Sequence, residues 1–245
     1  YGNRFRFHTM KFPDPLIHGT LIKRYKRFMA DVTLDDGSVV TAHCANSGSM
    51  LCVKDEGAKV WISPARNPDR KLKFTWELIK VGRATVGINT QWPNRIVEDA
   101  IVKGKIPELD GYESLRREVK YGKNSRIDLL LEDPKRPTCY VEVKSVTLRR
   151  GKGPDDALEF PDAVTTRGTK HLVELSDMVK QGHRAVMMYL AQRNDGKKFS
   201  IAADIDPAYN KALQAAMKAG VEVLCYDCKV NVRGIELSAP VELAL

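Results

Sequence analysis

The sequence lacks the features of a membrane or secreted protein. No run approaches the roughly 18 consecutive apolar residues that a membrane-spanning helix requires, so we expect no membrane segment. Cysteine is scarce, and five residues, an odd number, argue against a secreted disulfide scaffold and favour reduced thiols. The first residues show no apolar signal-peptide core either. Together these absences predict a cytoplasmic protein without a membrane partner.

Motifs of several common enzyme classes are also missing. The patterns GxxxxGK[ST], GxSxG and HExxH do not occur, which argues against an NTPase, a serine hydrolase and a zincin. Cys225 and Cys228 form a lone CxxC without a second ligand pair, and this predicts two ordinary thiols rather than a zinc site. His43, beside Cys44, shows no metal-ligand spacing.

What the sequence does have is positive charge, and its distribution is uneven. The net charge is +9. Residues 1–85 hold 15 Lys and Arg against 8 Asp and Glu, whereas residues 86–245 hold 25 against 23. A basic segment ahead of a nearly neutral one indicates polyanion binding, most often to nucleic acid. The alternative is a basic surface that only keeps the protein solvated.

Residues 10–85 predict a small β-barrel. Strands separated by turn signals are expected at 16–34, 38–44, 58–62, 74–80 and 83–89. Asp35-Asp36-Gly37 predicts a hairpin between the first two. A long first strand followed by short ones fits an OB-fold, whose face and loops often bind oligonucleotides. An SH3-like barrel would give much the same pattern.

Residues 86–245 predict an α/β domain, with the boundary near residues 82–90. Helical spacing occurs at 94–102, 165–181 and 207–219. Strand patterns occur at 115–121, 126–131, 139–146, 184–192, 221–226 and 235–243. The segment 184–192 is almost continuously apolar, as expected of a strand buried on both faces. The Gly-, Pro- and Asp-rich segment 151–162 is expected to be a loop.

Three residues of this domain carry the clearest chemical signal. Asp128 alternates with apolar neighbours in RIDLLLE, and Glu142 and Lys144 follow in CYVEVKSV. Side chains two positions apart on a strand share a face, so Glu142 and Lys144 point the same way. If the two strands are adjacent, Asp128 lies beside Glu142. The pattern therefore predicts two carboxylates and an ammonium on one face of a sheet.

Such a group suits metal-assisted phosphodiester hydrolysis. Neighbouring carboxylates repel each other and remain ionised together only with a cation between them. Oxygen ligands with open water positions favour Mg²⁺ or Mn²⁺, which polarises a phosphoryl oxygen and activates water. Lys144 would position that water or neutralise charge that develops on the phosphate. The alternative is a plain ion pair on a solvated strand.

Two levels of resemblance support the chemical interpretation. The D…ExK pattern resembles the PD-(D/E)XK nuclease superfamily, although Ile127 stands where a proline usually precedes the aspartate. GTLIKRYKRFMADV, AHCANSGSM, the pair SRID and EVKSVTL, and FPDAVTTRGTKHL together resemble the sugar fermentation stimulation protein A family. The similarity extends over nearly the whole chain from Lys11.

The family resemblance implies an N-terminal OB-fold, a C-terminal nuclease-like domain and DNA binding. It places Asp128, Glu142 and Lys144 on the nuclease motif positions. The name of the family also suggests a regulatory role in carbohydrate metabolism, without a mechanism.

Other carboxylates are candidates for a third metal ligand. Glu118, on the strand before Asp128, is the predicted one, and Glu98 or Asp99 on the preceding helix are alternatives. Exposed surface charge is the competing interpretation of each. The dipeptide Pro161-Asp162 is not followed by ExK, so we do not assign it to the motif, although Asp162 remains a candidate to line the site.

Two basic segments are candidates for nucleic-acid contacts. The first is the run Lys23, Arg24, Tyr25, Lys26, Arg27 and Phe28, in which cations that suit phosphates alternate with aromatic rings that suit bases. The second comprises Arg167, Lys170 and His171, which share one helix face and would meet DNA or border the metal site. A solvated helix face is the alternative for the second segment.

The sequence thus predicts a DNA-binding protein with a nuclease-type site for Mg²⁺ or Mn²⁺. One hypothesis is that it is an active DNA endonuclease or exonuclease. The alternative is a non-catalytic, weakly sequence-specific DNA-binding regulator that retains the nuclease fold. Because no reading helix is evident, binding to single- or double-stranded DNA is expected to depend mainly on phosphate contacts.

Overall fold

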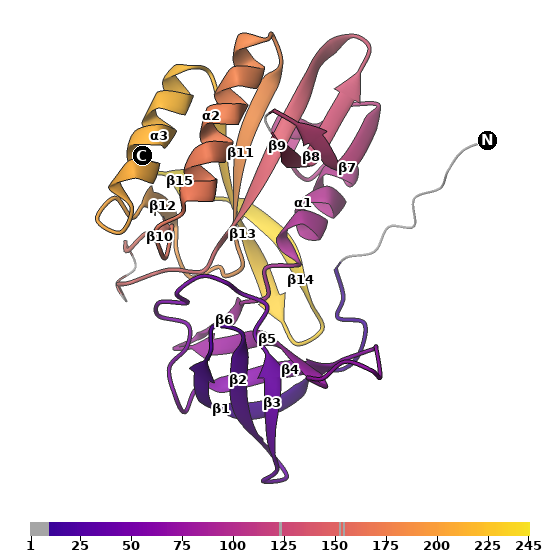
Figure 1. The fold of residues 1–245 in the computed structure, drawn as a ribbon, viewed down its shortest axis with the longest axis vertical. Helices are drawn as coiled ribbons and strands as arrows, with labels where there is room; N and C mark the ends of the chain where they lie inside the picture. Colours follow the sequence, from indigo (N-terminus) through magenta and orange to yellow (C-terminus); the bar gives the residue numbers. More distant parts are fainter. Residues whose placement is uncertain (1–9, 123, 152, 154) are drawn as a thin grey trace, which may run out of the picture.

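A β-barrel and an α/β unit lie end to end along the long axis of the molecule (Figure 1). The computed structural model describes residues 10–122, 124–151, 153 and 155–245. The barrel comprises strands β1 to β6, and the α/β unit contains the remaining strands and the three α-helices. This arrangement confirms the expected fold class, an OB-like barrel followed by a mixed α/β domain.

Six strands form the barrel, and their pairing closes it. They are β1 (Ile17–Tyr25), β2 (Met29–Leu34), β3 (Val39–His43), β4 (Lys59–Pro64), β5 (Phe74–Val81) and β6 (Ala84–Gly87). The sheet order is β3-β2-β1-β4-β5-β6, and a parallel pairing of β3 with β5 closes it. Small and branched side chains fill the interior around the fully buried Trp76.

The prediction of one long first strand over residues 16–34 is wrong. The chain turns between β1 and β2, where Lys26 and Arg27 adopt left-handed backbone conformations with φ of 45° and 64°. These residues are neither Gly nor Asn, which are the usual signals for such a turn. The turn is therefore invisible in the residue pattern. The predicted hairpin at Asp35-Asp36-Gly37 does join β2 to β3.

The α/β unit is built on a six-stranded mixed sheet with the order β14-β13-β11-β9-β8-β7. Its strands are β7 (Ser114–Tyr121), β8 (Ser125–Asp133), β9 (Arg136–Val146), β11 (Arg184–Ala191), β13 (Glu222–Asn231) and β14 (Gly234–Pro240). The central strand β11 is buried on both faces and pairs in parallel with β9 and β13. Its nearly continuous apolar sequence follows from that position.

Helices cover both faces of this sheet. They are α1 (Pro93–Val102), α2 (Thr166–Lys180) and α3 (Pro207–Lys218). Apolar residues of α1 pack in one core cluster, and those of α2 and α3 pack in another on the opposite face. The longest helix of the described chain has 15 residues, and none of its helices is both long and apolar enough to cross a bilayer.

Short elements account for the remaining differences from the sequence prediction. A 3₁₀ turn (Pro107–Leu109) precedes β7, and β10 (Leu158–Phe160), β12 (Lys198–Ile201) and β15 (Glu242–Leu243) form a small parallel sheet. The expected loop 151–162 therefore contains a strand, and the expected strand 235–243 is divided into two. Strands of two to four residues are too short to show a period.

All five cysteines are free, and four of them are buried. Cys225 belongs to the core cluster beneath α2 and α3, whereas Cys228 belongs to the cluster beneath α1. The two thiols of the CxxC thus lie on opposite faces of β13, in agreement with the expectation of ordinary thiols.

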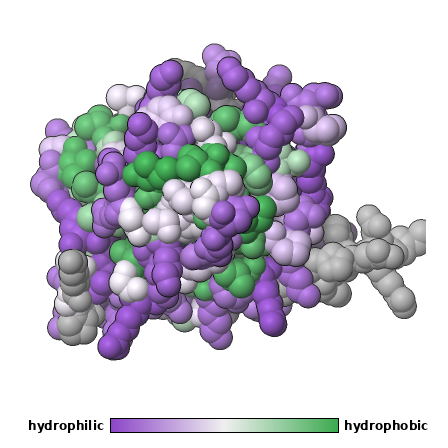
Figure 2. Space-filling model, turned by 90° about the horizontal axis from the view of Figure 1, so that it is seen from below, coloured by the Kyte–Doolittle hydropathy of each residue, from purple (hydrophilic) through white to green (hydrophobic). Residues whose placement is uncertain are grey.

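Viewed from the barrel end, the surface is mixed, with apolar groups surrounded by hydrophilic ones (Figure 2).

The barrel is attached to the α/β unit through the loop that follows β3. The carboxylate of Asp162 accepts a hydrogen bond of 2.7 Å from the backbone N–H of Met50, and its carbonyl oxygen accepts one from the Ser49 hydroxyl. A Cβ on Gly48 would come within 2.6 Å of the Asp162 carboxylate, so a larger residue there would displace this carboxylate from Met50. Asp162 is therefore an anchor between the two units.

Replacing Asp162 by alanine removes the acceptor of the Met50 N–H. We expect the free energy of unfolding to fall by about 1–3 kcal/mol, the usual cost of an unsatisfied buried donor. Chemical denaturation followed by circular dichroism measures the change. Asp55→Ala removes an exposed barrel carboxylate and serves as the control, with an expected effect below about 0.5 kcal/mol. Equal stability of the two variants would contradict the anchor.

Candidate functional site

Strands β8 and β9 bring two carboxylates together. Their register pairs Leu129 with Val141, so the next step along the ladder places Asp128 opposite Glu142. Side chains directly opposite each other in an antiparallel pair share a face. The carboxylate of Asp128 also reaches across to β9, where its Oδ2 accepts a hydrogen bond of 2.8 Å from the Val143 N–H.

Asp128 is held on its other side by helix α1. The Asn94 side chain donates to Oδ1 of Asp128 over 2.8 Å. Burial, followed by the nearby charge of Glu142, raises the pKa of Asp128 to about 6. The sequence prediction did not select Asn94, because nothing in a single amide next to Pro93 indicates that the start of this helix faces β8.

Glu142 is almost completely buried, with 2% of its surface exposed. The ammonium of Lys144 lies 2.7 Å from its Oε1, and Nδ1 of His171 contacts the same oxygen. Burial by itself would raise the pKa of Glu142, but the bonds from His171 and Lys144 outweigh burial and lower it. Glu142 is therefore an ionised carboxylate inside the protein at neutral pH.

Helix α2 adds His171 to the cluster formed by Asp128, Glu142 and Lys144. His171 is turned inward, and its Nδ1 also lies 3.3 Å from the Lys144 ammonium. On the opposite side of the ring, Arg167 Nε lies 3.4 Å from its Nε2. Arg167 is exposed, so the chain of contacts runs from the surface cation to the buried Glu142. His171 therefore faces Glu142 in the interior and does not belong to a solvated helix face.

The other carboxylates considered from the sequence make no described bond to Asp128 or Glu142. Glu118 lies opposite Asp128 in the register of β7 and β8, but it is exposed, with a left-handed backbone of φ 52°. Glu98 Oε2 lies 3.4 Å from Arg117 Nη1, and Asp99 pairs with Lys103, the residue that follows α1.

The donor set fits a hard divalent cation with much of its coordination left to water. Within the described residues, no three His, Cys, Asp or Glu side chains gather as a ready-made metal centre. The site offers two carboxylates, and Glu142 Oε2 is buried with no hydrogen-bond partner in the described structure. Mg²⁺ is commonly held by one or two carboxylates and several waters. An orphaned buried carboxylate oxygen is what such an ion would satisfy.

The basic run of the barrel has two different environments. Arg24 is half-buried, and its guanidinium donates to the carbonyl oxygens of Asn46 and Gly48, each over 3.0 Å. Arg27 donates to the Ser47 carbonyl over 3.0 Å. Both arginines thus fix the loop that reaches Asp162, a structural contact that the sequence pattern did not indicate.

The remaining basic candidates lie at the surface. Lys23 and Lys26 are exposed on the barrel, and the Lys23 ammonium lies 5.4 Å from the centre of the Tyr25 ring. Lys170 is exposed on α2, where it bonds to the Ser125 hydroxyl over 3.1 Å. These side chains are accessible to a polyanion, whereas most donors of Arg24 are already engaged.

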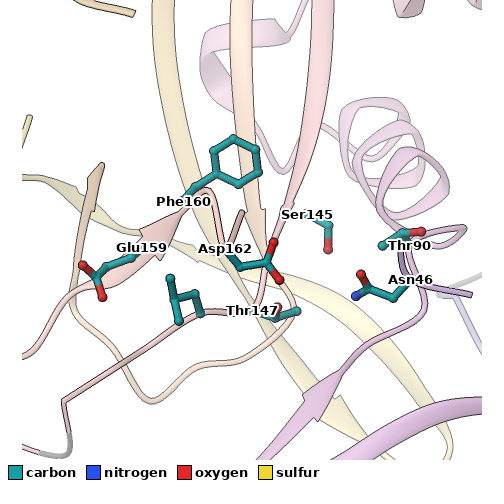
Figure 3. A pocket seen from close by; sticks show the side chains of 8 residues that line it. Asn46, Thr90, Ser145, Thr147, Glu159, Phe160 and Asp162 are labelled. Atoms are coloured by element: carbon teal, nitrogen blue, oxygen red, sulfur yellow. The ribbon is translucent and has the colours of Figure 1, made fainter. Parts of the chain in front are cut away.

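A small cavity lies at the junction of the two units. Its volume is about 40 Å³, and its lining includes Asn46 and Thr90 from the barrel side and Ser145, Thr147 and Asp162 from the α/β side (Figure 3). That space admits a water molecule but not a nucleotide. Ser145 also lies next to Lys144 in β9, so it points to the other face of the sheet. The cavity is therefore separate from Asp128 and Glu142.

Comparison with known proteins identifies the family. Residues 22–88 match the description "SfsA N-terminal OB domain", and residues 91–234 match "Sugar fermentation stimulation protein RE domain". The chain belongs to the sugar fermentation stimulation protein family, SfsA, as its motifs predicted.

Similar proteins span almost the same length. A sugar fermentation stimulation protein homolog of Rhodospirillum rubrum is 62% identical over 234 residues, covering 92% of this chain and 96% of that protein. A homolog of Paramagnetospirillum magneticum is 58% identical and covers 96% of this chain and 98% of its own. The solved structure of Pyrococcus furiosus SfsA in complex with Ca²⁺ is 25% identical, with a TM-score of 0.86, covering 97% of this chain and 99% of the other.

Replacing His171 by alanine tests whether it supports the buried Glu142 carboxylate. The variant leaves Oε1 with Lys144 as its partner, and we expect the free energy of unfolding to fall by about 1–3 kcal/mol. Val173→Ala, on the exposed side of the same helix, is the control and is expected to stay within about 0.5 kcal/mol of the parent. Chemical denaturation in EDTA distinguishes the two. A His171→Ala protein as stable as the control would show that Glu142 does not need this partner.

Proposed function

We propose that this member of the SfsA family is a DNA-binding nuclease that depends on a divalent metal ion. The observation that carries the proposal is the position of Asp128 opposite Glu142, with the Lys144 ammonium 2.7 Å from Glu142. Residues 10–85 are assigned to DNA binding, and residues 86–245 to the metal site. The reaction class is hydrolysis of a phosphodiester bond.

The metal assignment is supported from two directions. The orphaned oxygen of Glu142 and the carboxylate of Asp128 form a donor set that suits an oxygen-loving cation. The P. furiosus relative, similar over nearly the whole chain, was solved in complex with Ca²⁺. Mg²⁺ and Mn²⁺ share this preference for oxygen ligands and are the ions assigned here. Glu118, opposite Asp128 in the register of β7 and β8, is the proposed third ligand.

Each residue of the cluster has a definite task in such a site. When bound, a divalent cation supplies Lewis-acid polarisation of the phosphate and a more acidic water. Asn94 and the Val143 N–H fix the orientation of the Asp128 carboxylate. His171 fixes that of Glu142. Lys144 provides a fixed positive charge where negative charge develops on the phosphate.

The DNA assignment is supported by the charge of the barrel and of α2. Residues 10–85 carry 13 Lys and Arg against 8 Asp and Glu, a net charge of +5, and Lys23 and Lys26 are exposed there. Arg167 and Lys170 are exposed beside the cluster on α2. Phosphate contacts from these cations give binding that weakens with salt and reads little sequence. The free cysteines fit a reducing compartment such as the cytoplasm.

Glu142→Gln and Asp128→Asn should abolish DNA cleavage. Each substitution removes a ligand charge with little change in shape, so the loss should exceed the about 10–100-fold that partners of metal ligands usually cost. Cleavage of labelled single- and double-stranded DNA in Mn²⁺ or Mg²⁺ measures the effect. Glu113→Gln, at an exposed carboxylate of the same domain, is the matched control and should cleave like the parent.

Two outcomes would contradict the proposal. Cleavage that persists equally in Glu142→Gln identifies a contaminating nuclease. Absence of cleavage by the parent protein, with DNA binding intact in every metal tested, favours instead a non-catalytic DNA-binding regulator.

Asn94→Ala provides a graded test of the same site. Because Asn94 bonds to Asp128 rather than to the ion, its loss should weaken Mn²⁺ binding by about 10–100-fold without eliminating it. Isothermal titration calorimetry on metal-free protein measures this affinity. Asn210→Ala, on α3 and without a described bond to Asp128 or Glu142, should bind Mn²⁺ like the parent. Unchanged affinity in Asn94→Ala would argue against Asp128 as a ligand.

A further inference from the structure

The rim of the barrel carries an exposed aromatic pair that the metal site does not use. Phe28 is 43% exposed and is the one aromatic residue among the large exposed hydrophobics of the described chain. Its ring stacks on His43, with centroids 6.4 Å apart and planes inclined by 27°. Because 43% of Phe28 is exposed, the part of its ring that His43 does not cover can contact an external partner.

Cations flank both rings of this pair. The Arg27 guanidinium lies 5.8 Å from the centre of the Phe28 ring, and Lys26 is exposed in the same turn. Arg70 bonds to Thr75, which pairs directly with His43.

The pair continues as an aromatic surface across neighbouring strands. Tyr25 of β1 lies opposite Met29 of β2, which in turn lies opposite His43 of β3. The carboxylate on this surface, Asp31, is already engaged by the Tyr25 hydroxyl at 3.0 Å and by Thr41 at 2.8 Å. The surface therefore presents rings and positive charge.

The aromatic pair lies at the end of the barrel that faces the α/β unit. The Phe28 carbonyl accepts the Cys44 N–H over 2.8 Å. Immediately after Cys44, the chain enters the loop that bonds to Asp162, and this loop runs between the two units (Figure 1). A strand of nucleic acid bound to the pair would lie at the junction, on the way to the α/β unit.

We propose that Phe28 and His43 form a stacking platform for unpaired bases of single-stranded DNA. Lys26, Arg27 and Arg70 would contact the phosphates of the same segment. Aromatic side chains stack on the faces of bases, which a duplex hides in its interior and a single strand exposes. The proposal refines the proposed function, on which it rests for DNA as the ligand, by naming a substrate with a single-stranded region.

Fluorescence anisotropy tests the platform with the full-length chain in EDTA, so that no cleavage occurs. The probes are a labelled single-stranded oligonucleotide and the matching duplex, at fixed salt. Phe28→Ala should weaken single-strand binding about tenfold, as the loss of one stacked base predicts, and should change duplex binding less than twofold. Phe28→Trp should restore single-strand affinity because it restores an aromatic face.

Val39→Ala is the matched control, because Val39 is 62% exposed on the same barrel but outside the pair. It should bind both probes like the parent, and thermal unfolding should show that all variants are folded. A base analogue whose fluorescence falls on stacking should be quenched by the parent and not by Phe28→Ala. Equal single-strand affinity in Phe28→Ala and the parent would overturn the platform, as would an equal loss for both probes.

The result separates this platform from the metal-dependent activity. Single-strand binding that needs Phe28, together with no metal-dependent cleavage by the parent, supports the platform and refutes the nuclease. If cleavage needs Glu142 but Phe28→Ala binds single-stranded DNA as tightly as the parent, the nuclease is supported and the platform is refuted.

Discussion

The Glu142 carboxylate lies in a sheet interior where an isolated charge is very costly. The α/β unit compensates by placing the Lys144 ammonium and the His171 imidazole on the same oxygen. Lys144 follows from the strand period, but the contact with His171 requires α2 to pack over β9 with position 171 on its buried face. The compensation is also incomplete, because Oε2 has no partner among the described residues. A structure that served stability alone would have an apolar side chain here, which often stabilises a core more than a buried ion pair does.

The two carboxylates of the site differ in their environments, and this difference explains their opposite pKa shifts. The carboxylate of Asp128 accepts from two neutral donors, an amide side chain and a backbone N–H. These do not compensate for burial and for the charge of Glu142, so the pKa of Asp128 rises to about 6. Glu142, by contrast, bonds to His171 and to the ammonium of Lys144, and these bonds lower its pKa. A cation near both would remove the repulsion that separates them.

The sequence predicts those parts of the site that depend on one strand or on a regular period. Alternation places Glu142 and Lys144 on one face, and the fold class follows from the order of strands and helices. The hydrogen bonds of Asn94 and Asp162 could not be predicted from the sequence, because each joins residues at least 34 positions apart in the chain. Arg24 resembled a phosphate ligand because a charge pattern does not show that carbonyl groups of another loop surround the side chain. The turn at Lys26 contains no glycine, asparagine or proline, so the sequence predicts one continuous strand where the structure has two.

The contacts between the barrel and the α/β unit determine what a basic barrel contributes to the carboxylate site. Two domains on a free linker would bind one polyanion at independent positions, and the gain would be only an increased local concentration. Here Arg24 and Arg27 bind the loop after β3, and that loop bonds to Asp162. Asp162 lies three residues before Thr165, the residue that caps α2, and α2 carries His171. The turn between β1 and β2 is therefore connected to the helix that carries His171 by a continuous series of hydrogen bonds. If the barrel binds DNA as proposed, these contacts would present the phosphate backbone to the α/β unit in one orientation, which is the requirement for positioning one bond at a catalytic group.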